Sequence, residues 1–176
     1  SSDLPVVVDN TFATPCNQKP LALGADLVIH SATKALGGHN DLMAGAIAGS
    51  KEHYDKLWFT RQAIGTTLDA YSASLLERGL KTFPLRAERM AASGMLVARH
   101  LTRCPGISNV HYPGLRQCEG YRAAARQMTR GFGGMLAFDV GRAQEDAKRF
   151  ISALHVIRHA VSLGATESLI CIPYLT

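Results

Sequence analysis

The chain has 176 residues, a net charge of +5 and a hydrophobic fraction of 47%, which is enough apolar material for a sizeable globular core. No apolar run approaches the ~18–20 residues of a membrane-spanning helix, and the scattered basic residues favour a solvated basic face over a nucleic-acid surface. The four cysteines form no C-x-x-C pair and no secretory signal opens the chain. We therefore expect no metal site, no membrane contact, reduced thiols and a cytoplasmic location.

The first part of the chain alternates apolar runs with helical segments. Residues 6–9 and 27–30 are continuous apolar runs typical of buried strands, and residues 17–24 between them predict a short helix that ends at Gly24. Residues 44–49 are small and apolar and predict a third strand. The strand–helix–strand order favours an α/β fold with a parallel sheet.

The middle of the chain predicts long helices. Ser50 is a candidate N-cap for a helix that continues to about Ile64. Residues 68–103 also have a helical pattern, which Pro84 is expected to interrupt. The leucines and methionines of residues 68–103 are expected to form the apolar faces of this helical segment. The sequence Cys-Pro-Gly at 104–106 predicts a turn, so we expect one domain over residues 1–103 and a second over residues 104–176.

The last part of the chain predicts a mixture of strands and one helix. Apolar runs indicate strands at residues 110–112, 135–140 and 156–161, and a helix is expected over residues 144–154. This alternation predicts a small α+β unit.

Four chemically informative side chains lie at or just after the ends of the first two predicted strands. Asp9 ends the first strand, and the second strand runs into Ser31, Thr33 and Lys34 before a glycine turn. Because the carboxyl ends of neighbouring parallel strands meet at one sheet edge, these groups are expected to lie close together. Pyridoxal 5′-phosphate (PLP) needs a lysine amine for its aldehyde and an acid for its pyridinium nitrogen. Lys34 is therefore the predicted catalytic residue, and Asp9 the predicted cofactor ligand.

The two hydroxyls suit the phosphate of the same cofactor. Ser31 and Thr33 would donate hydrogen bonds to it, because alternate residues of an extended backbone point the same way. The alternative interpretation is that these hydroxyls cap the turn, and that Asp9 caps its own strand end.

The segments around these residues resemble the PLP-dependent family of cysteine and methionine metabolism (trans-sulfuration) enzymes. The resemblance rests on residues 8–15, 20–26, 31–41, 78–82, 112–115, 131–134 and 162–164, in order along nearly the whole chain. It implies a fold-type-I PLP-dependent transferase, with part of a large-domain parallel or mixed sheet and a smaller α+β C-terminal domain. Because chains of this family are considerably longer, it also implies that the sequence is incomplete at both ends.

The same resemblance implies roles and an activity. It implies that Lys34 holds the cofactor and acts as a general base, and that Ser162 helps to place the substrate carboxylate. The closest likeness is to cystathionine γ-synthases, which implies γ-replacement on an O-activated homoserine by cysteine to give cystathionine. The alternatives are elimination by a γ-lyase or β-lyase of cystathionine or methionine, an O-acylhomoserine sulfhydrylase, and an inactive fragment that lacks the rest of the site. Family members are usually homotetramers built as dimers of dimers, so a homo-oligomer acting on a small amino acid is expected.

Overall fold

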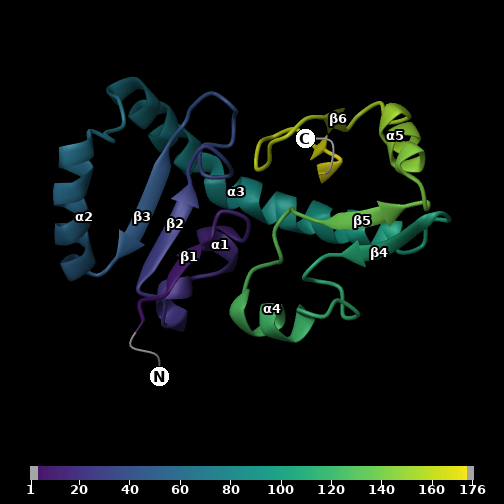
Figure 1. Ribbon diagram of the computed structural model, residues 1–176, viewed down its shortest axis with the longest axis horizontal. Helices are drawn as coiled ribbons and strands as arrows, with labels where there is room; N and C mark the ends of the chain where they lie inside the picture. Colours follow the sequence, from purple (N-terminus) through teal and green to yellow (C-terminus); the bar gives the residue numbers. More distant parts are fainter. Residues whose placement is uncertain (1–3, 174–176) are drawn as a thin grey trace.

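The computed structural model describes residues 4–173, and its first sheet has the strand order β1-β2-β3 (Figure 1). β1 (Val7–Asp9) runs parallel to β2 (Leu27–Ser31), as the strand–helix–strand order predicts. β3 (Gly45–Gly49) is antiparallel to β2. The sheet is therefore mixed, because the segment after β2 turns back on itself without a crossover helix.

The connection between β1 and β2 is not the single helix over residues 17–24 that the sequence predicts. It consists of α1 (Thr14–Asn17) and a 3₁₀ turn, η1 (Pro20–Leu23). Pro20 explains the division, since a proline disfavours helical backbone in the residue before it, and Lys19 has φ −122° and ψ 82°. Gly24 ends the turn in the left-handed region at φ +98°, as expected.

Two helices follow the sheet. α2 (Lys51–Ile64) begins at Ser50, whose hydroxyl accepts a hydrogen bond from the His53 N–H, as its capping role predicts. α3 (Ala70–Leu101) is one continuous helix, so the interruption expected at Pro84 is wrong. In the turn before the proline, Gly79 O accepts hydrogen bonds from the side chains of Thr82 and Arg86. The proline removes the backbone bond to Leu80 O, and the helix continues through it.

The buried face of α3 is made mainly of small residues, not of its leucines. Leu85 and Leu96 are 70% and 68% exposed. The buried positions recur every three or four residues, which is the spacing of one helix face. They are Gly79, Phe83, Ala87, Ala91, Gly94, Ala98 and Leu101. Small residues let the segments around the sheet approach the helix axis closely.

The last part of the chain lies along the C-terminal half of α3 (Figure 1). β4 (Ile107–His111) pairs antiparallel with β5 (Ala137–Val140), and α5 (Gln144–Ser152) packs on β5. The expected strand over residues 156–161 is reduced to β6 (Arg158–His159), which pairs with the unpredicted β7 (Leu169–Ile170). The helix α4 (Tyr121–Gln127) was also not predicted. Within residues 4–173, no helix combines the length and the apolar character needed to cross a membrane.

Two apolar clusters lie along α3. One contains Ala35, Phe83 and Ala87, and it joins the segment after β2 to the helix. The other cluster lies at the C-terminal half of the helix and contains Ala98, Tyr112 and Leu115. Two hydrogen bonds join residues before position 103 to residues after it: the Thr129 N–H donates to Asn17 O, and the Gln18 side chain donates to the Gln127 side chain. The division of the chain into domains over residues 1–103 and 104–176 remains a prediction.

Candidate active site

Lys34 lies in a tight turn directly after β2. The Lys34 N–H donates to Ser31 O at 3.1 Å, and the Gly38 N–H donates to Lys34 O at 2.7 Å, so the turn is closed by its own backbone. The Lys34 Nζ donates a hydrogen bond to Ser162 Oγ at 3.3 Å, although the two residues are 128 positions apart. The structure thus brings together two of the predicted site residues from opposite ends of the chain.

A second close approach fixes the Ser162 segment against this turn. Gly164 has φ +78°, and a Cβ built on it would collide with the backbone of Ala35. Only glycine fits here without displacing one of the two segments. The Ser162 hydroxyl is therefore positioned by backbone packing.

Asp9 ends β1 as an exposed carboxylate with a local partner. Its Oδ1 accepts the Thr11 N–H at 2.9 Å. Hydrogen bonding from the Thr11 side chain and backbone lowers the pKa of Asp9 below its ordinary value, and the nearby His30 contributes in the same direction. The carboxyl group therefore stays anionic well into acid, which is the charge that a pyridinium nitrogen requires.

Thr11 is a functional candidate that the sequence reasoning did not identify. Its buried Oγ1 accepts the Ser31 N–H at 2.8 Å, while its own N–H binds Asp9. One side chain thereby links the ends of β1 and β2, the two strands that carry Asp9 and Ser31. The available signal was its position two residues after a strand-end aspartate, where turn-forming hydroxyls are common.

Ser31 and Thr33 differ in backbone position and in hydrogen bonding. In the parallel register Asp9 pairs with Ile29. Ser31 is two residues beyond Ile29, so it lies on the same sheet face as Asp9. β2 ends at Ser31, so the extended backbone assumed for Thr33 is wrong. Thr33 Oγ1 instead accepts the Ala44 N–H at 2.9 Å and donates to Ala44 O at 3.3 Å. That geometry matches the turn-capping alternative.

The two faces of the first sheet differ. Val28 and His30 point to the buried side, and burial lowers the pKa of His30 against the opposing effect of Asp9. The face that carries Asp9 and Ser31 is open, with Ile29 38% exposed and Ile47 56% exposed. A carboxylate and the Ser31 hydroxyl thus share an open face at the sheet end that Lys34 follows in the chain, and α/β proteins bind ligands at such ends.

Comparison with known proteins identifies the family. The sequence profile described as "Cys/Met metabolism PLP-dependent enzyme" matches residues 1–176. The chain belongs to this family. It is 45% identical over 166 residues to an L-methionine gamma-lyase of Pseudomonas putida, covering 93% of this chain and 42% of that protein. It is 43% identical over 165 residues to cystathionine gamma-synthase 1, chloroplastic, of Arabidopsis thaliana, covering 94% of this chain and 29% of that protein.

Solved structures of this family agree with the fold. The crystal structure of cystathionine gamma-lyase from Lactobacillus plantarum complexed with L-serine has a TM-score of 0.93 and 38% sequence identity, over 98% of this chain and 45% of that one. The expected partial fold-type-I PLP-dependent architecture is confirmed. The chain spans less than half the length of the relatives it matches.

The residues present fit the cofactor of this PLP-dependent family. The donor set comprises a primary amine held by a hydroxyl, an aspartate kept anionic by Thr11, and the Ser31 hydroxyl. These are the groups that PLP needs for its aldehyde, its ring nitrogen and its phosphate. The assignment of Lys34, Asp9, Ser31, Thr33 and Ser162 as site residues remains a prediction.

Proposed function

We propose that this chain supplies the amine and acid groups of the active site of a PLP-dependent enzyme acting on sulfur amino acids. The observation that carries the proposal is the hydrogen bond from Lys34 Nζ to Ser162 Oγ at the end of β2, beside the strand that ends in Asp9. A lysine amine oriented by a hydroxyl is set up to act as nucleophile and general base. Membership in a PLP-dependent family supports the same interpretation.

Each side chain has a distinct role in this proposal. Pyridoxal phosphate, when bound, supplies the electron sink for a carbanion at the substrate Cα. Lys34 Nζ binds the cofactor and moves protons at Cα and Cβ of the substrate. Asp9, kept anionic, binds the ring N–H. Ser31 donates to the phosphate, and Thr33 contributes by rotating its hydroxyl proton away from Ala44 O. Ser162 orients the lysine amine and helps to place the substrate carboxylate.

Within the family we propose γ-replacement on an O-activated homoserine. The Cγ–O bond breaks and releases the acyl group as a carboxylate, and the thiol of cysteine forms the new Cγ–S bond and gives up its proton. The relatives include a synthase and a lyase at nearly equal identity, 43% and 45%, so elimination is the competing reaction at the same site. Assays with O-succinyl- or O-acetylhomoserine plus cysteine, against cystathionine or methionine alone, separate the two. Release of keto acid from cystathionine without any replacement product contradicts the synthase proposal.

The cofactor site is tested with Lys34→Ala. Wild-type protein mixed with PLP is expected to gain a visible absorbance band, and borohydride reduction is expected to fix the cofactor on Lys34, as read by peptide mass spectrometry. Lys34→Ala is expected to lose both signals because the amine is gone. Lys51→Ala, at an exposed lysine of α2, is the matched control and is expected to keep them. A cofactor fixed equally on Lys51 and Lys34 contradicts the proposal.

The chain's share of its relatives' length favours a second candidate. With 42% of the methionine gamma-lyase covered, the chain by itself is an inactive part of the site. No absorbance band from the chain alone, but a band after addition of a polypeptide supplying the remaining length, supports this candidate.

We further propose that the protein is cytoplasmic and forms a homo-oligomer arranged as a dimer of dimers. Light scattering of the active protein tests the oligomeric state.

A further inference from the structure

One arginine holds the turn that carries Lys34. Arg86 of α3 donates from Nη1 to Ala35 O at 2.7 Å and from Nη2 to Leu36 O at 3.3 Å. Its Nη2 also donates to Gly79 O at 2.7 Å, and its Nε to Thr82 Oγ1 at 3.1 Å. The guanidinium therefore joins the helix to the two residues that directly follow the lysine.

The partners of Arg86 are neutral. Within residues 4–173, no carboxylate forms an ion pair with it, and burial lowers its pKa. The cation also lies 6.0 Å from the centre of the Phe83 ring. A planar, multiply bonded guanidinium fixes the direction of each carbonyl it binds, which a lysine ammonium does not. The arrangement suits the orientation of backbone rather than the neutralisation of an acid.

Close packing also limits the space around the turn. A Cβ on Gly79 would collide with Gly37 O, and a Cβ on Gly38 would collide with the Arg86 guanidinium. Gly164 presses on the opposite side, against the backbone of Ala35. The backbone at Lys34 is thus held between α3 and the Ser162 segment.

We propose that Arg86 is a positioning residue for the Lys34 amine. By fixing Ala35 O and Leu36 O it fixes the backbone from which the lysine reaches Ser162. This inference rests on the proposed function for the importance of Lys34, but not for the geometry itself. Losing the guanidinium should release the turn locally and free the amine, while the rest of the fold stays in place.

Two readouts test the proposal without cofactor. Hydrogen exchange at the Gly37 and Gly38 amides, which bond to Ala32 O and Lys34 O, reports the turn. The rate of acetylation of Lys34, relative to that of exposed Lys51, reports the amine. Arg86→Gln is expected to speed exchange at these amides at least tenfold and acetylation of Lys34 at least threefold. Arg86→Lys is expected to give smaller changes, since an ammonium binds fewer of the carbonyls.

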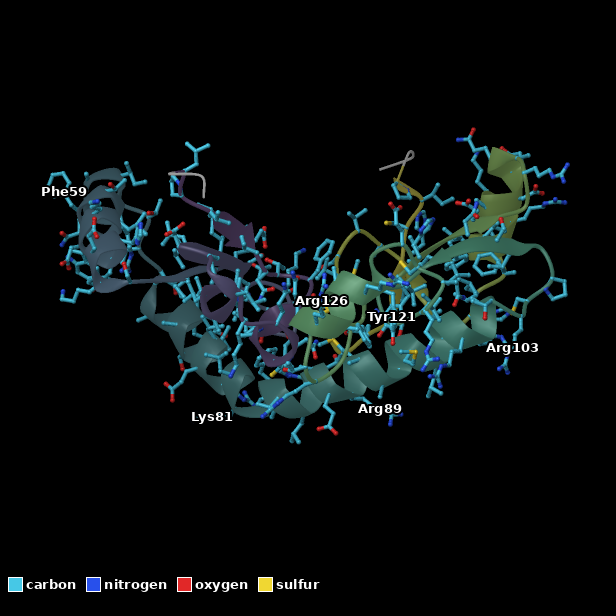
Figure 2. All side chains as sticks on the ribbon, turned by 90° about the horizontal axis from the view of Figure 1, so that it is seen from below. Phe59, Lys81, Arg89, Arg103, Tyr121 and Arg126 are labelled. Carbon is cyan, nitrogen blue, oxygen red and sulfur yellow. The ribbon has the colours of Figure 1, made fainter. Side chains whose placement is uncertain are left out.

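Arg89→Gln is the matched control. Arg89 is exposed on the outer side of the same helix (Figure 2). Its substitution is expected to leave the exchange rate and the acetylation rate within twofold of wild type. Unchanged exchange or unchanged acetylation in Arg86→Gln overturns the proposal. So does an equal increase in exchange throughout α2 and α3, which would mean general destabilisation. A wild-type protein that binds no PLP, even after addition of a polypeptide supplying the remaining length, contradicts the proposed function, while these two rates still decide the role of Arg86.

Discussion

At the scale of single residues, the site depends on short polar links between strand ends. Thr11 binds the Asp9 carboxylate with its N–H and receives the Ser31 N–H on its hydroxyl. The lowered pKa of Asp9 follows from these contacts. The lowered pKa of Asp9 and the position of Ser31 therefore depend on one buried side chain that carries no charge.

Thr11→Val tests this link. Valine preserves the shape but removes the acceptor of the partly buried Ser31 N–H, and leaving such a group unpaired costs up to about 1–3 kcal/mol. The pKa of Asp9 is expected to rise toward its ordinary value of 3.8, measured by NMR titration. Because a lowered pKa stabilises the fold above that value and the benefit is lost as the pH falls, the variant should lose less stability in acid. Thr60→Val, at an exposed threonine of α2, is the control.

At the scale of elements, the helix α3 determines how the segments around the sheet are placed. Its buried stripe of small residues lets the turn after β2 reach the helix backbone. Gly79 is a point of close approach, since a Cβ built on it would collide with Gly37 O. Helix propensity alone would favour alanine at this position, so the glycine reflects tertiary packing.

Gly79→Ala is expected to destabilise the protein despite the better helix propensity of alanine. The added methyl group overlaps Gly37 O, and overpacking of this kind typically costs about 1–3 kcal/mol. The free energy of unfolding in urea measures the change. Gly120→Ala is the control, since a Cβ there meets nothing within 4 Å and φ is −77°. Equal stability of the two variants would show that the turn yields to α3.

At the scale of the whole molecule, α3 joins two apolar clusters, and Tyr112 is the largest buried side chain of the second. Its ring is fully buried, and its hydroxyl donates to Gly133 O at 2.9 Å and lies 3.3 Å from Ala91 O. Burial raises the pKa of Tyr112 to about 12. The neutral phenol is therefore part of what connects β4, α3 and the glycine-rich segment at residues 131–134.

This raised pKa predicts sensitivity to alkali. In the unfolded chain the phenol ionises near its ordinary value of 10, so the stability it contributes is complete below that pH and is lost as the pH rises to about 12. Tyr112→Phe is expected to flatten the fall in unfolding free energy over this range. At neutral pH it should cost about 1–3 kcal/mol, because the buried Gly133 carbonyl loses its donor. Tyr71→Phe, at a tyrosine 74% exposed, should change neither quantity.

The sequence alone determined the strands that end in Asp9 and Ser31, the caps at Gly24 and Ser50, and the family, because these depend on local patterns of apolar runs, turn residues and motifs. Only the tertiary structure decided that Lys34 meets Ser162 across 128 positions, that Thr33 caps a turn, and that α3 continues through Pro84. The roles of Thr11 and Arg86 belong to the same group. They arise from contacts between segments distant in sequence, which side-chain and backbone packing select and no local pattern specifies.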